Sequence, residues 1–163
     1  MLSRRSITAL LVLLSAPLGA AAQAPPAAPV PQAAARHVPM LADLMASAQS
    51  RHIKLWFAVK GAHWELAAYE LARLKATLAD AAGLYSGLPI TDLTTMARPL
   101  DLLAEVVAAK QTAKFADGYA KLTSACNACH QAMERGFITL RVPTASPFSD
   151  QSFETRNAAQ RTK

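Results

Sequence analysis

The sequence predicts an all-α protein that folds as an antiparallel four-helix bundle. Apolar residues recur at helical spacing in four successive stretches of the chain. The connections between these stretches are short, which favours antiparallel packing of neighbouring helices. About 100 residues remain for folding once the N-terminal segments described below are set aside, and this length suits one domain.

The first two helices are predicted on either side of Gly61, which marks the break between them. Charged side chains lie mostly off the face that the first helix buries, as expected for an amphipathic helix. This face comprises Leu41, Leu44, Met45, Ala48, His52, Leu55, Trp56 and Val59. The second helix presents Trp64, Ala67, Leu71, Leu74, Leu78, Ala81 and Tyr85 in the same way.

The third and fourth helices follow a break at residues 86–89, whose sequence is Ser-Gly-Leu-Pro. Pro99 lies inside the third stretch, so this helix either kinks at Pro99 or begins there. Gly136 is the expected C-cap of the fourth helix, and no strong breaker occurs at residues 110–114. The third face comprises Leu93, Met96, Leu100, Leu103 and Val107. The fourth comprises Phe115, Tyr119, Leu122, Cys126, Cys129 and Met133.

Cys126, Cys129 and His130 form a C-x-x-C-H sequence, and the chain has no cysteines other than these two. Positions i, i+3 and i+4 of a helix share one face, so the three side chains point the same way. C-x-x-C-H is the attachment sequence for covalently bound haem. We therefore expect one haem c, bound by both thiols near the end of the last helix, with His130 as the proximal iron ligand.

Three other interpretations of this motif have less support. A thioredoxin-type C-x-x-C belongs near a βαβ pattern, and nothing strand-like precedes Cys126. A structural zinc site normally needs four ligands, whereas the motif supplies three within reach of one another. A plain disulfide remains an alternative in an oxidising compartment, but it gives His130 no role.

The N-terminus has the pattern of a secretory signal peptide. Residues 1–22 combine Arg4 and Arg5, a short apolar run and a cleavage site of small residues that ends at Ala22. The apolar run is too short to span a bilayer as a stop-transfer helix. We therefore expect an exported protein without a membrane span, from which the signal peptide is cleaved.

The rest of the chain divides into three parts. Residues 23–39 are rich in proline and alanine, which favours an extended tether. The helical domain is expected at residues 40–136. Residues 137–163 have no helical period and form a non-helical tail, whose phenylalanines either fold back over the haem edge or belong to a partly disordered terminus.

The charge of the chain is moderately positive. The formal net charge is +6, and removing the two arginines of the signal peptide leaves +4. This charge favours redox partner proteins with an acidic docking surface. No basic run or aromatic-basic pattern suggests nucleic acid, and no Ser-His-Asp set or acid pair suggests hydrolytic catalysis, so we expect no enzyme. Whether the bundle forms a homodimer is left open.

The segment from Phe115 to His130, with Tyr119 and Leu122 before the motif, resembles the aromatic-rich last helix of the cytochrome c-prime family, the class II c-type cytochromes. The resemblance covers residues 40–136 and implies a four-helix bundle that receives its haem after export, in the periplasm. The chain departs from the family's pattern after the motif, because Met133 stands where the family usually has an aromatic residue.

The resemblance also suggests which residue lies on the distal side of the iron. The family's first helix places an aliphatic residue or methionine there, and Gln49-Ser50 resembles the family's Arg-Gln-Ser sequence, which brings His52 to the distal position. An imidazole on an apolar face needs a hydrogen bond or a metal. His52 is therefore the first candidate for a distal ligand, with a hydrogen-bonded core histidine as the alternative. Met45 is the second candidate, or else a core filler.

Two functions follow from these expectations. With two strong axial ligands the protein is a periplasmic electron carrier, whose potential depends on ligand identity, burial and hydrogen bonding. With an open distal site it binds or senses small gases such as nitric oxide and carbon monoxide, as the resemblance to cytochrome c-prime allows. The electron carrier is the preferred hypothesis, and the role of His52 distinguishes the two.

Overall fold

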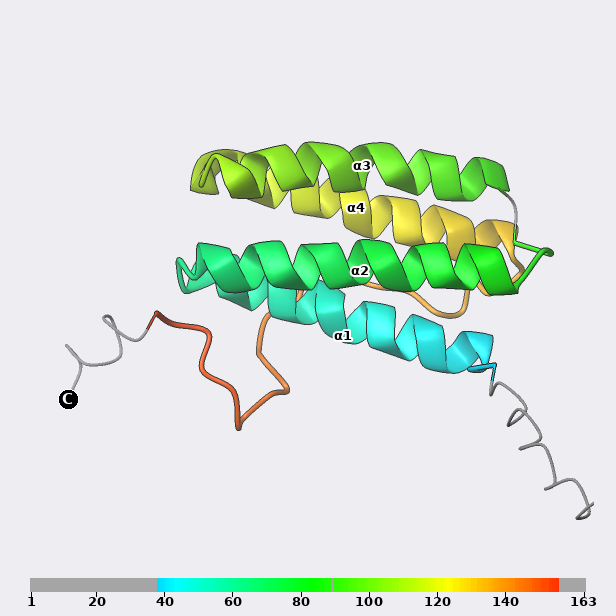
Figure 1. Cartoon of the computed structure of the whole chain (residues 1–163), viewed down its shortest axis with the longest axis horizontal. Helices are drawn as coiled ribbons and strands as arrows, with labels where there is room; N and C mark the ends of the chain where they lie inside the picture. Colours follow the sequence, from blue (N-terminus) through cyan, green and yellow to red (C-terminus); the bar gives the residue numbers. More distant parts are fainter. Residues whose placement is uncertain (1–37, 89, 156–163) are drawn as a thin grey trace, which may run out of the picture. The chain divides into compact units, whose positions relative to one another are not determined.

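Each of the four stretches with helical spacing forms one α-helix (Figure 1). The computed structural model describes residues 38–88 and 90–155, without the side chains of residues 90–95. The helices are α1 (Leu41–Lys60), α2 (Trp64–Leu84), α3 (Ile90–Ala108) and α4 (Thr112–Ala132). No strand occurs in the described ranges, and the prediction of an all-α protein with four helices is confirmed.

Several of the predicted segments lie outside the described residues. These are the signal peptide at residues 1–22, most of the tether and the end of the tail, residues 156–163. Among the helices that are described, none has the length and hydropathy that a membrane span requires.

Three helix ends share one backbone geometry, in which a residue just after the helix has a positive φ. Ala62, Lys110 and Glu134 have φ values of 54°, 54° and 56°. After each, the next amide bonds to a carbonyl five residues earlier, as in Arg135 N to His130 O at 2.7 Å, which is the Schellman arrangement. Lys110 thus makes the break between α3 and α4, where the sequence shows no strong breaker. At the end of α4, Glu134 rather than Gly136 takes the left-handed position.

Helices α3 and α4 pack closely. α3 begins at Ile90 and continues through Pro99, so the alternative in which it begins at Pro99 is not observed. A Cβ atom at Gly118 would lie 2.8 Å from Cδ1 of Leu103. The two helices therefore approach this closely because position 118 has no side chain.

The apolar faces of the helices meet in one core. Helix α1 packs on α2, α2 on α3, α3 on α4, and α1 on α4. Leu55, Tyr119 and Leu122 are completely buried in it. Aromatic rings form the contact between α1 and α4, because the Trp56 ring centroid lies 4.9 Å from that of Tyr119 and 5.9 Å from that of Phe115.

After α4 the chain runs back along the helices (Figure 1). We call residues 137–155 the strap; they contain no helix. The Phe148 ring lies under Lys54 Nζ at 4.5 Å, and the ring centroids of Phe153 and Phe57 are 5.8 Å apart. Phe148 and Phe153 thus pack against α1, whereas Phe137 is 80% exposed. A position of these three phenylalanines over a haem edge stays a prediction.

Candidate haem site at the end of helix α4

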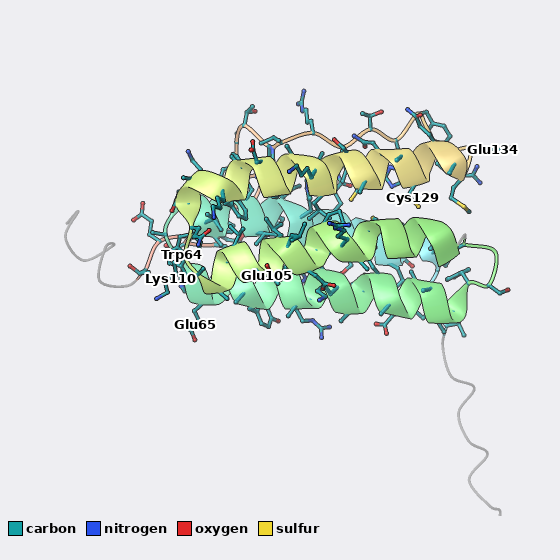
Figure 2. The ribbon with its side chains drawn as sticks, turned by 90° about the horizontal axis from the view of Figure 1, so that it is seen from above. Trp64, Glu65, Glu105, Lys110, Cys129 and Glu134 are labelled. Carbon is teal, nitrogen blue, oxygen red and sulfur yellow. The ribbon has the colours of Figure 1, made fainter. Side chains whose placement is uncertain are left out.

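The C-x-x-C-H residues lie in the last turns of α4 (Figure 2). Cys126 and Cys129 are half-buried and form no disulfide. Burial, with a smaller contribution from the nearby Cys129, raises the pKa of the Cys126 thiol to about 11. The Cys126 thiol therefore keeps its proton at neutral pH, which makes it a poor nucleophile and does not favour a thioredoxin-like role.

The His130 ring is oriented by the backbone of the strap. Its Nδ1 lies 2.7 Å from the carbonyl oxygen of Ile138. A carbonyl oxygen can only accept a hydrogen bond, so Nδ1 carries the proton. In a neutral ring Nε2 then holds the lone pair, and this is the arrangement in which a histidine binds a metal through Nε2.

Asn127, which stands between the two cysteines, also bonds to the strap. The Leu140 N–H donates to Asn127 Oδ1 at 2.7 Å, and Asn127 Nδ2 donates to the Leu140 carbonyl at 2.9 Å. The sequence did not predict the partners of Asn127 and His130. After Gly136 no period indicates where the chain runs, so the strap could not be placed from the sequence.

His52 lies on α1, buried against α4, with a hydroxyl at each ring nitrogen. Nε2 is 2.9 Å from Thr123 Oγ1, and Nδ1 is 2.9 Å from the Tyr119 hydroxyl. The His52 and Tyr119 rings also stack, with centroids 4.4 Å apart. A neutral imidazole is satisfied here when Nδ1–H donates to the Tyr119 oxygen, because the Tyr119 hydroxyl proton goes to the His52 carbonyl. Nε2 then accepts from the Thr123 hydroxyl, which gives up its bond to the Tyr119 carbonyl. Coordination of iron by His52 would require one of these bonds to break.

Burial also determines the protonation of His52 and Tyr119. His52 is 2% exposed, and desolvation lowers its pKa to about 4. Burial raises the pKa of Tyr119 far above its usual value, and the nearby Cys126 adds to this. Both groups are therefore neutral at physiological pH.

The contacts between α1 and α4 set the register of Met45. His52 meets Tyr119 and Thr123, whereas Trp56, one turn later on α1, meets Phe115 and Tyr119. Partners on α4 thus move to lower numbers as α1 proceeds. On α1, Met45 lies seven residues before His52, and on α4, His130 lies seven residues after Thr123. Seven residues of an α-helix span about 10 Å along its axis and return to the same face of the helix. Because His52 contacts both Tyr119 and Thr123, half-buried Met45 is level with the stretch from Cys126 to His130.

The end of the molecule that carries the motif has uncovered apolar side chains. Tyr85 OH donates to the Pro39 carbonyl at 2.8 Å, which brings the end of α2 to the start of α1. Around this end, large apolar side chains are 45–80% exposed, namely Val38, Met40, Leu84, Phe137 and Ile138. A concentration of exposed apolar surface is typical of a binding site.

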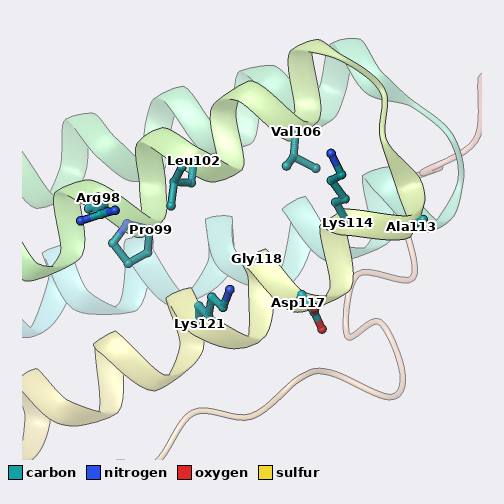
Figure 3. A pocket seen from close by; sticks show the side chains of 9 residues that line it. All are labelled: Arg98, Pro99, Leu102, Val106, Ala113, Lys114, Asp117, Gly118 and Lys121. Carbon is teal, nitrogen blue, oxygen red and sulfur yellow. The ribbon is translucent and has the colours of Figure 1, made fainter.

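Two hollows lie elsewhere on the described part of the chain. A groove of about 870 Å³ between α3 and α4 is lined by Leu102, Val106 and several basic side chains (Figure 3). A smaller hollow of about 340 Å³ lies between α1 and the strap, beside His52. Within the described ranges, no three His, Cys, Asp or Glu side chains converge as a metal-ion site.

Comparison with known proteins identifies no relative: no family model matches the chain, and no curated protein or solved structure is significantly similar to it.

Proposed function

We propose that this chain is an exported, periplasmic electron carrier, a mono-haem c-type cytochrome similar to the cytochrome c-prime family. Haem c is bound by Cys126 and Cys129, with His130 as the proximal iron ligand, in an antiparallel four-helix bundle. The observation that carries the proposal is the His130 ring beside the two thiols. Its Nδ1 proton is held by the Ile138 carbonyl, which leaves Nε2 as the ligand nitrogen.

The surroundings of the motif support this assignment. The two cysteines form no disulfide and lie three residues apart on one helix, so both sulfurs face the same way for thioether bonds to two vinyl groups. The exposed apolar side chains at this end offer cover for a flat apolar group. When bound, haem c supplies a one-electron couple between ferric and ferrous iron. The chain's own residues would hold that group through Cys126 and Cys129 and would offer Nε2 of His130 to the iron.

Of the two candidates for the distal ligand, Met45 is favoured by its position. It is level with the C-x-x-C-H residues and on the α1 face that points to α4, whereas both nitrogens of His52 already bond to hydroxyls. A methionine opposite a histidine is the ligand pair of electron-transfer cytochromes c and gives a high potential. His52 then serves to hold α1 against α4 and so keeps Met45 in register.

The groove between α3 and α4 is the proposed docking surface for an acidic redox partner. Arg98, Lys114 and Lys121 line it together with one acid, Asp117. Figure 3 shows Lys114 extending toward Val106 while Asp117 points away from α3. The basic rim and apolar floor are complementary to an acidic surface with an apolar centre. A second copy of this positively charged chain would be repelled.

The proposal is tested by expressing the full chain in a bacterium that attaches haem c. We expect a red protein whose haem stays on the chain after denaturation. Replacing both Cys126 and Cys129 by alanine should abolish this covalent attachment, whereas Ser124→Ala, an exposed change on the same helix, should not. A colourless wild-type protein with two titratable thiols would refute the proposal.

The distal ligand is tested by the optical spectrum of the same protein. We expect low-spin iron in both oxidation states, with conversion to high spin in Met45→Ala but not in His52→Ala. Met40→Ala is the control, because Met40 is 62% exposed and should leave the spectrum unchanged. Conversion in His52→Ala alone would assign the ligand to His52. High-spin ferrous iron in the wild type, with rapid carbon monoxide binding, would favour gas binding instead.

A further inference from the structure

Asn127 holds the strap by two hydrogen bonds that leave its amide only one orientation. The Leu140 N–H needs an acceptor and the Leu140 carbonyl needs a donor, and the amide of Asn127 supplies both at 2.7 Å and 2.9 Å. Such a pair resembles the contact between neighbouring strands. It fixes the position of Leu140 along α4.

This clamp lies next to the acceptor of the His130 proton. Asn127 and His130 are three residues apart on α4 and so lie on the same side of the helix. On the strap, Ile138 and Leu140 are two residues apart. The strap runs antiparallel to α4 here, so Ile138 bonds to His130 and Leu140 bonds to Asn127. A displacement of Leu140 therefore also displaces the Ile138 carbonyl, which lies 2.7 Å from His130 Nδ1.

We propose that Asn127 is a positioning residue for the axial ligand. By clamping the strap, it keeps the Ile138 carbonyl on the Nδ1 proton and so fixes the direction and electron-donating strength of His130. This inference rests on the proposed function. A hydrogen bond from Nδ1–H raises the basicity of a ligating imidazole. A more basic ligand stabilises ferric over ferrous iron, so the clamp lowers the midpoint potential.

The experiment compares the red wild-type holoprotein with Asn127→Ala. Loss of the clamp should make the midpoint potential more positive by roughly the equivalent of a tenfold change in the ferric-to-ferrous equilibrium, about 59 mV for one electron. In the same variant, the Leu140 amide and the His130 Nδ1 proton should exchange faster with solvent, measured by NMR of the ferrous protein. Thr139→Ala is the matched control, because it removes only the 3.3 Å bond from the Thr139 hydroxyl to the Gly136 carbonyl.

Each outcome separates the inference from the proposed function. A wild-type protein without covalent haem overturns the proposed function. A red wild-type protein whose potential and Nδ1 proton are unchanged in Asn127→Ala, although the Leu140 amide exchanges faster, overturns only the role of Asn127. An equal shift in Thr139→Ala overturns it too, because any disturbance of the strap would then suffice.

Discussion

His52 shows how burial can keep a titratable side chain neutral while its neighbours satisfy its hydrogen bonds. The Thr123 and Tyr119 hydroxyls satisfy both ring nitrogens, and the Tyr119 hydroxyl also donates to the His52 carbonyl at 2.8 Å. His52, Tyr119 and Thr123 therefore join α1 to α4 through hydrogen bonds between neutral groups. Protonating the ring would leave a cation in the core beside two neutral hydroxyls, and this is unfavourable.

His52 should therefore make the protein less stable in acid. Its pKa is about 4 in the folded state and near 6.5 when unfolded. Between these values the unfolded chain binds more protons, so the free energy of unfolding falls as the pH is lowered from 6.5 to 4. The full effect is about 3 kcal/mol. Urea unfolding across this range should show a smaller decline in His52→Gln, whose amide does not titrate.

Thr123→Val provides the control for this measurement. It removes one partner of His52 but keeps the buried imidazole, so stability should fall by about 1–3 kcal/mol at every pH while the decline in acid persists. If His52→Gln and the wild type lose stability in parallel from pH 6.5 to 4, then His52 is not a neutral core histidine.

The sequence predicted the motif residues, but not all of their partners. Helical spacing alone is enough to place Cys126, Cys129 and His130 on one face. The choice between His52 and Met45 required the register of α1 against α4, which depends on how Trp56 and Tyr119 pack. Such contacts are tertiary and leave no periodic pattern in the sequence.

Among the elements, the strap depends on a close approach at the end of α1. A Cβ atom at Gly61 would clash with the carbonyl oxygen of Phe153 and lie 2.8 Å from its carbonyl carbon. Ala62, the next residue, forms an isolated bridge with Glu154. Gly61 is therefore needed for the space it leaves free, since its φ of −84° is accessible to any residue.

Gly61→Ala should release this end of the strap. We expect a loss of about 1–3 kcal/mol in the free energy of unfolding, as for other overpacked positions, and faster hydrogen exchange near Phe153. Gly83→Ala is the matched control, because nothing lies within 4 Å of the added Cβ and alanine in a helix is better by roughly 0.5–1 kcal/mol. Equal stability of the two variants would contradict this role of Gly61.

The helices themselves were predictable, whereas some of their ends were not. Each apolar face is long and periodic, so the sequence identifies all four helices. Lys110 and Glu134 end helices in a left-handed conformation that costs of order 1 kcal/mol for residues other than glycine. The packing of α3 and α4 outweighs this conformational cost. A rule that expects glycine in the left-handed position after a helix therefore misses these two helix ends.

For the whole molecule, the position of the positive charges matters more for binding an acidic partner than the net charge does. Two of the three basic side chains in the groove, Lys114 and Lys121, lie on the same helix as the motif. An acidic partner attracted to this groove would lie along the N-terminal half of α4, where Lys121 is five residues before Cys126. Electrostatic attraction of this kind raises association rates and weakens with salt.

Charge reversal in the groove between α3 and α4 tests whether this groove attracts an acidic partner. With an acidic flavodoxin as the probe partner, Lys114→Glu combined with Lys121→Glu should slow electron transfer roughly tenfold at low salt, and the difference should vanish at high salt. Lys60→Glu combined with Arg73→Glu changes the net charge equally but lies outside the groove. Equal slowing of electron transfer by both double variants would show that the net charge alone determines the rate. Stopped-flow kinetics measures the electron-transfer rate of each double variant.

The strap has a consequence for the order in which this protein matures. Cys126 is packed against the core with a protonated sulfur, and the residues beside it are tied down by segments that the ribosome makes later. An enzyme that modifies both sulfurs needs them accessible. Under the proposed function, ligation of the pigment would therefore come first, on the exported but still unfolded chain, and wrapping by the C-terminal segment afterwards.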